Sequence, residues 1–219
     1  FNVPYPLPKC DWIAVPDFEA GAMENWGCIT SRLCEVCIRA DATISTRKRT
    51  VDVVCHELAH MWFGDLVTMK WWNDLWLNEG FATYMANVFA TAELYPELLT
   101  DEDRISDLLD VLALDGKDST HPISVPIENP ADIEQIFDLI SYEKGCALIH
   151  MMSTFVGSDH FIAGVSEYLQ AFALGNAETD DLWRHINAHC TSNIVEVARE
   201  WTYTAGYPLV SVERNAEKK

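Results

Sequence analysis

The sequence predicts an α+β fold that is mostly helical, with a small strand-containing N-terminal part and a larger helical C-terminal part. Two observations lead to this prediction. Short apolar runs bounded by proline and glycine occur before residue 32, as is typical of strands. After residue 50, apolar residues recur at helical spacing in one segment after another. The chain has 219 residues and can bury a substantial core.

The expected elements follow the chain in a simple order. Strands are predicted at residues 12–15 and 28–30, and residues 32–50, which lack clear periodicity, are predicted to be a loop or a short helix. Helices are expected over residues 50–63, 75–91, 100–114, 131–139, 143–156, 158–173, 179–190 and 194–204. We therefore expect a single domain, 1–219, with a strand-containing front at 1–50, two site-bearing helices at 51–91 and a helical subdomain at 92–212.

The most informative motif is a His-Glu-x-x-His pentapeptide followed by a further glutamate. His56 and His60 are four residues apart on a predicted helix and therefore share one face, and Glu79 follows on the next helix. Two imidazoles and one carboxylate make a zinc site with one position open for water, as in catalytic sites. Glu57 is rotated from His56 by about 100° and is suited to take a proton from that water. We expect one Zn²⁺ per chain.

The charge of the chain limits its partners. The formal net charge is −19, which argues against nucleic acid and anionic membranes as partners, and no apolar run approaches the roughly 18 residues of a membrane span. Between Glu93 and Glu143 there are fourteen acidic and two basic residues. This segment is either a solvated surface or the source of a negative electrostatic field that attracts cationic peptides. The sequence is compatible with both.

The cysteines and the N-terminal residues bear on location. Seven cysteines without regular spacing favour free thiols in a reducing compartment, so we expect a cytoplasmic protein. Cys34 and Cys37 form a CxxC pair, for which ordinary thiols are favoured over a redox site or a second zinc site. The first residues have neither the basic segment nor the apolar core of a signal peptide, and we expect a fragment or processed form of a longer protein.

Four motifs along the chain resemble those of the gluzincin zinc aminopeptidases, the group containing aminopeptidase N and the puromycin-sensitive aminopeptidase. One motif is the pentapeptide with eighteen residues between it and Glu79, another is the stretch at 71–82, and another is Tyr142-Glu143-Lys144-Gly145. The first motif consists of Gly21, Ala22, Met23, Glu24 and Asn25. The resemblance covers nearly the whole chain and is closest to the puromycin-sensitive, cytosolic type.

The resemblance implies a thermolysin-like metallopeptidase domain that removes single residues from the N-termini of peptides. His56, His60 and Glu79 would hold zinc, and Glu57 would act as general base. Tyr142 would stabilise the negative charge that develops on the carbonyl oxygen.

The resemblance also implies a substrate-binding segment at residues 21–25. Glu24 would pair with the free α-ammonium group of the peptide. Gly21 and Ala22 would pair with the peptide backbone, as in strand addition. Met23 would line the first side-chain pocket, and Asn25 completes the motif.

The chain departs from the family pattern in two ways. Met61, Asp65 and Lys70 replace the usual Gln, Asn and Glu, and residues 31–46 differ from the usual sequence. None of these residues is an expected zinc ligand, so the chemistry should be retained. Family members carry a β-rich domain before this region and helical material after it, so we expect the chain to pack against further domains.

Two alternatives to a peptide-cleaving enzyme stay open. The first is a module that binds zinc and peptides with little or no turnover. The second is a bifunctional epoxide hydrolase and aminopeptidase, although that relative tends to have Gly rather than Ala at position 22.

Overall fold

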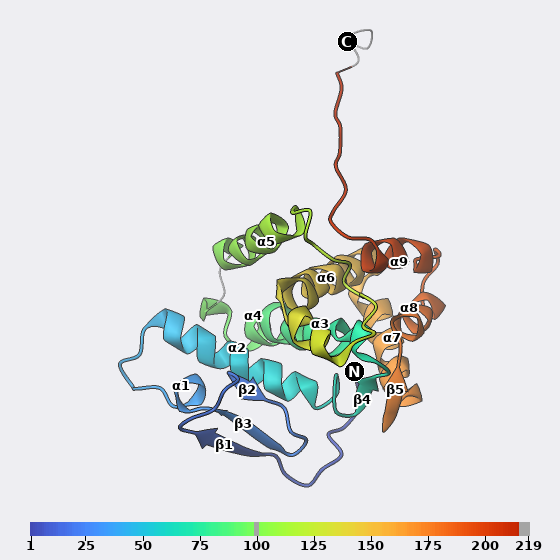
Figure 1. The fold of residues 1–219 in the computed structure, drawn as a ribbon. Coiled ribbons are helices and arrows are strands. Elements are labelled where there is room, and N and C mark those ends of the chain that lie inside the picture. Colours follow the sequence, from blue (N-terminus) through green and yellow to red (C-terminus); the bar gives the residue numbers. More distant parts are fainter. Residues whose placement is uncertain (99–100, 215–219) are drawn as a thin grey trace.

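The computed structural model describes residues 1–98 and 101–214 and has a strand layer packed below a helical body (Figure 1). The layer consists of β1 (Asp11–Val15), β2 (Ala22–Met23) and β3 (Cys28–Arg32), in the order β1-β3-β2. β1 is parallel to β3 and β2 is antiparallel to it. The predicted strands are confirmed. The sequence analysis missed β2, because two residues are too few to show an alternating pattern.

The segment after β3 combines a short helix with the start of a long one. α1 covers Leu33–Val36, and α2 covers Ile44–His60, so α2 begins six residues earlier than predicted. The backbone N–H of Thr46 donates to the side chain of Thr43 at 3.2 Å, and this cap fixes where α2 begins. The first turns of α2 are mostly exposed and polar, and they therefore lack the apolar periodicity on which the prediction depended.

The second site-bearing helix is interrupted. α3 (Trp76–Thr83) continues as a π-helical segment, η2 (Tyr84–Ala90), and then as α4 (Thr91–Leu94). Between α2 and α3 lie β4 (Val67–Met69) and the 3₁₀ turn η1 (Trp72–Asp74). β4 pairs in parallel with β5 (Gly175–Ala177). This pair was not predicted, because its two strands have three residues each and lie about a hundred residues apart.

The rest of the body is helical, as predicted. The segment predicted at 131–139 is a 3₁₀ helix, and residue 100 of the helix predicted at 100–114 lies outside the described residues. The elements are η3 (Pro96–Leu98), α5 (Asp101–Asp115), η4 (Pro130–Ile136), the π-helical η5 (Ile140–Lys144), α6 (Gly145–Val156), α7 (Ser158–Ala171), α8 (Thr179–Ala188) and α9 (Val195–Tyr203).

The core lies around α3 and brings two distant motifs together. Trp76 and Trp183 are fully buried and stack with ring centroids 5.6 Å apart. At Gly80 of α3, an added Cβ would lie 3.1 Å from the Cα of Gly145, at the start of α6. Because real Cβ atoms rarely come so close to backbone, α3 and the η5–α6 segment can approach this closely only with glycine at the contact. This approach sets Glu79 beside Tyr142.

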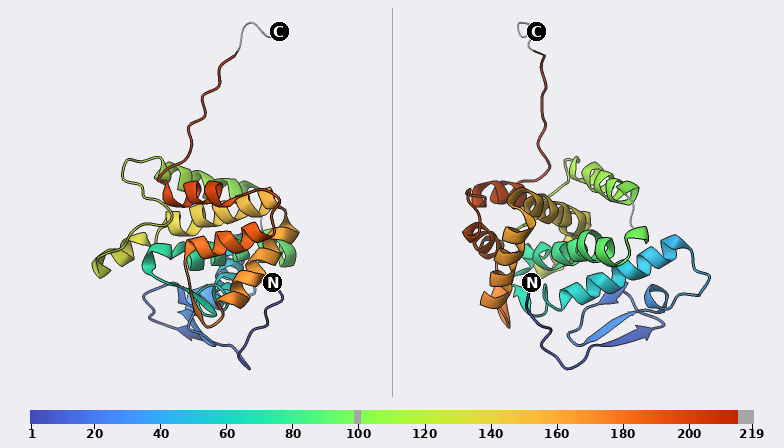
Figure 2. Two further views of the ribbon diagram at one scale, coloured as in Figure 1. Left: turned by 90° about the vertical axis from the view of Figure 1, so that its right-hand side faces the viewer. Right: turned by 180° about the vertical axis from the view of Figure 1, so that it is seen from behind.

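The two ends of the chain lie differently. Phe1 is close to α7, where its carbonyl accepts a 2.6 Å hydrogen bond from Ser166, whereas the segment after α9 extends away from the body (Figure 2). In that segment Leu209, Val210 and Val212 are highly exposed. Among the described residues, no helix combines the length and the apolar character needed to cross a membrane. All seven cysteines lie within the described residues, and none of them forms a disulfide there.

Candidate metal and catalytic site

Helix α2 presents its two histidines to one point. The Nε2 atoms of His56 and His60 lie 3.0 Å apart, and their ring centroids are separated by 4.6 Å. The Nδ1 atom of His60 lies 2.9 Å from the carbonyl oxygen of Phe63, which can only accept a hydrogen bond. That contact assigns a proton to Nδ1 and directs Nε2 toward the centre of the site.

Glu79 of α3 completes the group. Its Oε2 atom lies 3.2 Å from Nε2 of His56 and 3.3 Å from Nε2 of His60. Burial alone would raise the pKa of Glu79, but hydrogen bonds from the two histidines lower it to about 2. Burial likewise opposes protonation of His60, yet Glu79 raises the pKa of His60 to about 10, whereas burial lowers the pKa of His56. Glu79 and His60 therefore each favour the charged form of the other.

The three ligand atoms fit a zinc ion. The two imidazole nitrogens and the carboxylate oxygen lie within 4.8 Å of one another, and the measured pairs are separated by 3.0 to 3.3 Å. Ligands about 2.0–2.1 Å from a tetrahedral zinc are about 3.3 Å apart. The positions and the chemical nature of the ligands both suit Zn²⁺. Only three protein ligands converge among the described residues, which leaves room for a fourth, non-protein ligand.

Glu57 lies beside this group with an unsatisfied oxygen. The residue is 7% exposed, and its Oε2 atom is buried without a hydrogen-bond partner among the described residues. Burial, with additional effects from Glu24 and Glu79 and against that of His60, raises the pKa of Glu57 to about 8. A buried acceptor without a partner is rare in folded proteins, and a raised carboxyl pKa is typical of groups that exchange protons.

Tyr142 reaches the site from η5. Its ring is nearly parallel to that of His56, at an interplanar angle of 6° and a centroid distance of 5.9 Å. Burial and then the charge of Glu79 raise the pKa of its hydroxyl above the ordinary value. The side chain of Asp138 caps the start of η5 by accepting hydrogen bonds from the backbone of Ile140 and Ser141, at 2.9 and 3.2 Å. Tyr142 is therefore a neutral donor on a well-anchored segment.

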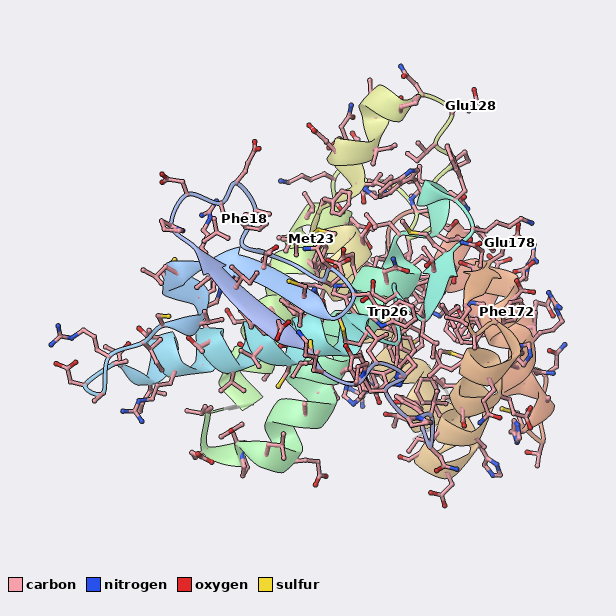
Figure 3. All side chains as sticks on the ribbon, turned by 90° about the horizontal axis from the view of Figure 1, so that it is seen from below. Phe18, Met23, Trp26, Glu128, Phe172 and Glu178 are labelled. Atoms are coloured by element: carbon pink, nitrogen blue, oxygen red, sulfur yellow. The ribbon has the colours of Figure 1, made fainter. Side chains whose placement is uncertain are left out.

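The segment at 21–25 borders the site along β2. Ala22 and Met23 pair with Ser31 and Thr30 of β3, so β2 is an edge strand of the sheet. The side chain of Met23 is 42% exposed and lies on the rim of the strand layer, on the side that meets the helical part (Figure 3). The strand ends next to Glu24.

Glu24 and Asn25 follow β2 and make different contacts. The Oε1 atom of Glu24 lies 4.0 Å from Nδ1 of His60, and the side chain is 19% exposed. The amide of Asn25 donates to Oγ1 of Thr30 at 3.1 Å and thereby holds the turn against β3. Gly21 precedes the strand, and its carbonyl accepts a 2.9 Å hydrogen bond from the backbone of Arg32. The site residues predicted from the sequence therefore all lie in one region of the molecule or next to it.

Asp65 is a site residue that the sequence analysis did not assign. Its pKa is raised to about 7 by burial and by the charge of Glu24, against the effect of His60, and its Oδ2 atom is buried without a partner among the described residues. The only signal in the sequence was its departure from the family pattern. The other departures are accommodated locally: Met61 is buried, and Lys70 forms a 2.8 Å ion pair with Glu178.

Residues 31–46, which differ from the usual family sequence, lie on one side of the site. α1 contacts β1, β3 and α2, and it places Glu35 within 2.9 Å of Arg49 on α2. This ion pair lies next to Gly21, where an added Cβ would lie 3.7 Å from Nη2 of Arg49 and 3.8 Å from Oε1 of Glu35. The divergent segment therefore supplies one wall beside β2.

Within the part of the chain that the structure describes, the fold and the ligand geometry define one candidate metal site between a strand layer and a helical body. Comparison with known families then identifies the class of protein. Residues 1–201 match the peptidase family M1 domain, and the chain belongs to this family.

Several curated relatives are named as aminopeptidases. The chain is 47% identical over 215 residues to Aminopeptidase 2 of Candida albicans, covering 97% of the chain and 23% of that protein. It is 46% identical over 221 residues to the mitochondrial Aminopeptidase 2 of Saccharomyces cerevisiae, covering 100% and 23%. It is 39% identical over 240 residues to the endoplasmic reticulum aminopeptidase 1 of Mus musculus, covering 97% and 26%. The chain thus spans about a quarter of the length of these relatives.

Proposed function

We propose that residues 1–219 form the thermolysin-like catalytic domain of a zinc-dependent aminopeptidase, with the three parts predicted at 1–50, 51–91 and 92–212. His56, His60 and Glu79 would hold one Zn²⁺. The observation that carries the proposal is the convergence of these three ligand atoms beside the unpaired, buried carboxylate oxygen of Glu57. Membership in a peptidase family and the names of the relatives support it.

The residues of the chain divide the chemistry of peptide-bond hydrolysis between them. When bound, zinc supplies a Lewis acid that makes water a nucleophile near neutral pH. Glu57 removes a proton as the water oxygen bonds to the peptide carbon, and it delivers that proton to the amine as the carbon–nitrogen bond breaks. The Tyr142 hydroxyl, kept neutral by its raised pKa, donates to the carbonyl oxygen as negative charge develops there.

The β2 segment explains why cleavage would occur at the first peptide bond. An extended peptide can add to the open edge of β2 at Gly21 and Ala22, next to the three ligands. Glu24 ends this groove and would pair with the free α-ammonium group, which fixes the distance from the amine to the bond that is cut. Met23, at the rim of the groove, would contact the first side chain.

The test is hydrolysis of a panel of aminoacyl-arylamides by protein of verified zinc content, with N-acetylated arylamides as controls. We expect turnover of free-amine substrates alone and a first-residue ranking from the panel. Glu57→Gln should retain zinc and lose turnover by a factor of about 10²–10⁴, the contribution of a positioned general base. Glu196→Gln, an exposed change on α9, is the matched control and should leave turnover and zinc content unchanged.

Two results would contradict the proposal. Equal hydrolysis of acetylated and free-amine substrates would mean that Glu24 does not select the amine, and the chain would not be an aminopeptidase. Zinc-loaded protein that binds peptides without turning them over would instead identify a zinc- and peptide-binding module.

The partners and location of the protein are part of the same proposal. We infer that the substrates are peptides with a free N-terminus and that the chain packs against further domains. The highly exposed Leu209, Val210 and Val212 support such packing, because single extended apolar segments are normally covered. A cytoplasmic location remains a prediction from the free thiols; two of the relatives carry mitochondrial and endoplasmic reticulum names, so the relatives do not decide it.

A further inference from the structure

An apolar cavity of about 670 Å³ lies between α5 and α6 and is lined in part by α9. Val111 and Leu112 of α5, Leu148 and Met151 of α6 and Trp201 of α9 belong to its lining. None of the residues that we propose for metal binding or catalysis belongs to it. The cavity is therefore separate from the candidate metal and catalytic site, and its volume is in the range of cavities that hold ligands.

Four residues of the lining are also exposed to solvent. Phe155 is 66% exposed and Tyr207 is 48% exposed, and the values for Leu108 and Met151 are 45% and 38%. Single exposed apolar side chains are ordinary on protein surfaces, but a group of them around one cavity indicates an interaction surface. The cavity is thus both apolar and open to solvent.

The charged residues of the lining have their partners within the fold. Asp115 and Lys144 form an ion pair at 2.8 Å, and their side chains are only 2% and 9% exposed. The Nζ atom of Lys144 also donates to the carbonyl of Gly206 at 2.9 Å, and the backbone N–H of Gly206 donates to Oδ1 of Asp115 at 3.1 Å. Because both charges are paired inside the protein, the cavity suits an apolar occupant.

The same contacts fix the point at which the chain leaves the cavity. Gly206 has a φ of 77°, a backbone conformation that favours glycine. Tyr207 belongs to the lining, and Pro208 restricts it to an extended backbone. The segment after α9 accordingly runs away from the body in every view (Figure 1 and Figure 2).

This segment is itself apolar. Leu209, Val210 and Val212 are 93%, 77% and 88% exposed. In an extended chain Val210 and Val212 point to one side and Leu209 to the other, so the segment can contact two walls at once. The chain therefore carries an apolar cavity and, beginning at its edge, an exposed apolar segment.

The geometry favours the cavity of another copy over the cavity of the same chain. To return to its own cavity, the segment would have to reverse direction after Pro208, and Leu209 and Val210 would then form the turn instead of filling the cavity. A β-branched residue such as Val210 is also unfavourable in tight turns that need a positive φ. Pointing outward, the seven described residues after Tyr207 reach up to about 25 Å, which is enough to enter a second molecule.

We propose that two copies of the chain form a dimer in which residues 208–212 of each copy enter the cavity between α5 and α6 of the other copy. The exchange is reciprocal, so it closes on itself about a two-fold axis. Fourteen residues line the cavity and seven described residues follow Tyr207, so about twenty residues of each copy take part, as in an ordinary protein interface. The dimer does not depend on the proposed aminopeptidase function. It needs nothing beyond these 219 residues, and further domains of a longer protein would compete for the same surface.

Sedimentation velocity of the unmodified chain, from low micromolar concentration upward, tests the dimer. We expect one transition from monomer to dimer and no larger species. Because each chain has a formal net charge of −19, two copies repel each other, and added salt should strengthen the dimer by screening this repulsion. A monomer at every concentration, open-ended assemblies, or a dimer that weakens with added salt would overturn the proposal.

Two variants place a charge on either side of the contact. Leu209→Asp changes the segment and Phe155→Asp changes the cavity, and both positions are exposed in the single chain, so folding should be retained. Each should raise the dissociation constant of the dimer at least about tenfold, because a charge replaces an apolar side chain that the dimer buries. Ile44→Asp, a change of the same kind at a 70% exposed position on α2, is the matched control and should leave the constant unchanged. An equal effect of Ile44→Asp would mean that net charge controls association, and the contact would be rejected.

A mixture of the two variants separates the exchanged contact from a general loss of association. Leu209→Asp protein keeps its cavity and Phe155→Asp protein keeps its segment, so one intact contact can form only between the two. We expect the mixture to associate more strongly than either variant alone and less strongly than the unmodified chain. A mixture that associates no more than its components would contradict the exchange.

Hydrogen exchange locates the segment in the dimer. The backbone amides of Leu209, Val210 and Val212 should exchange freely in the monomer and slowly in the dimer. Full protection in the monomer would place the segment in the cavity of its own chain, and a dimer without protection would place the contact elsewhere. Either result would overturn the proposal.

Discussion

Two buried carboxyl groups, those of Asp74 and Glu57, are set in opposite surroundings within the same region of the molecule. Asp74 is 2% exposed, and its Oδ1 accepts hydrogen bonds from the hydroxyls of Ser124 and Thr179, at 2.7 and 2.8 Å. Its Oδ2 accepts from the backbone of Thr179 at 3.1 Å. Glu57 is 7% exposed, and its Oε2 has no partner among the described residues.

The difference separates an acid with a structural role from the acid that we propose takes part in the reaction. Thr179 also accepts a 2.9 Å hydrogen bond from Trp76, so the Asp74 network joins the start of α3 to the start of α8. Every contact of that network is made within the protein, and nothing is left for a ligand. Around Glu57 the neighbouring charges come from Glu24, Glu79 and His60, and the oxygen stays unpaired. Depth of burial is similar for both groups, and hydrogen-bond satisfaction distinguishes them.

The largest expected effect comes from replacing the carboxyl group by an amide at Asp74 and, for comparison, at Glu57. Asp74→Asn should lower the free energy of unfolding by about 3–5 kcal/mol, because an amide cannot accept all the hydrogen bonds and leaves buried donors unpaired. Glu57→Gln should not lower it, since burial already disfavours the ionised form of Glu57 and its Oε2 makes no hydrogen bond among the described residues that the change could break. Urea unfolding of metal-free protein, monitored by circular dichroism, measures both values.

The exposed Asp118→Asn is the control for this pair and should change stability by less than about 0.5 kcal/mol. Equal losses at Asp74 and Glu57 would show that burial alone sets the cost, and the distinction drawn between the two acids would fail.

A second effect concerns the hydroxyl of Tyr142, the hydrogen-bond donor of the proposed site. Tyr142→Phe removes one hydroxyl and keeps the ring beside His56. We expect kcat to fall by about 10²–10³-fold, or about 2.7–4 kcal/mol, with a small change in KM, because the donor acts on charge that develops during the reaction. Kinetics with the best arylamide, at matched zinc content, would measure this.

Tyr95→Phe is the matched control, because Tyr95 is exposed and lies outside the site. A rise in KM at constant kcat for Tyr142→Phe would assign the hydroxyl to ground-state binding, and loss of zinc would assign it to the ligand shell. Either outcome would remove Tyr142 from its proposed role.

The approach of His56 and His60 to each other could be predicted from the sequence because it is local. The interval of four residues between His56 and His60 fixes their common face on any helix. The position of Glu79 is less local, and it depended on the expectation of a second helix. The close contact at Gly80 and Gly145, which brings Tyr142 to the same point, joins segments 65 residues apart, and periodicity contains no information about it.

The features that the sequence analysis missed share a physical cause. β4 and β5 are three residues long and are stabilised by pairing with each other, so neither has a pattern of its own. The early start of α2 depends on the Thr43 cap and not on an apolar face. The network of Asp74 was also missed, since its partners Ser124 and Thr179 are far away in the chain and are brought together only by the fold.

The smallest expected effect concerns Asp138, an acid that we compare with Asp74 and Glu57. Its partner is His121. His121 donates from Nε2 to Asp138 at 2.9 Å and from Nδ1 to the carbonyl of Pro122 at 2.7 Å, so it is protonated when both contacts are made. The hydrogen bond with Asp138 raises the pKa of His121 above 6.5, against the effects of burial and of Lys144. A raised histidine pKa stabilises the fold fully below the unfolded value, and this stabilisation is lost as the pH rises through the folded pKa.

We therefore expect His121→Gln to lower the free energy of unfolding by about 0.5–1 kcal/mol at pH 6, the range of a partly exposed ion pair, and by less at pH 8.5. Urea titrations of both proteins at the two pH values measure the difference, with the exposed His160→Gln as a control that should show no pH-dependent change. A loss of the same size at both pH values would mean that His121 contributes by packing alone. A decreasing loss would show that Asp138, which caps the segment carrying Tyr142, is held by a charge: like Asp74, this acid has its partner within the fold, but its partner His121 loses its charge as the pH rises.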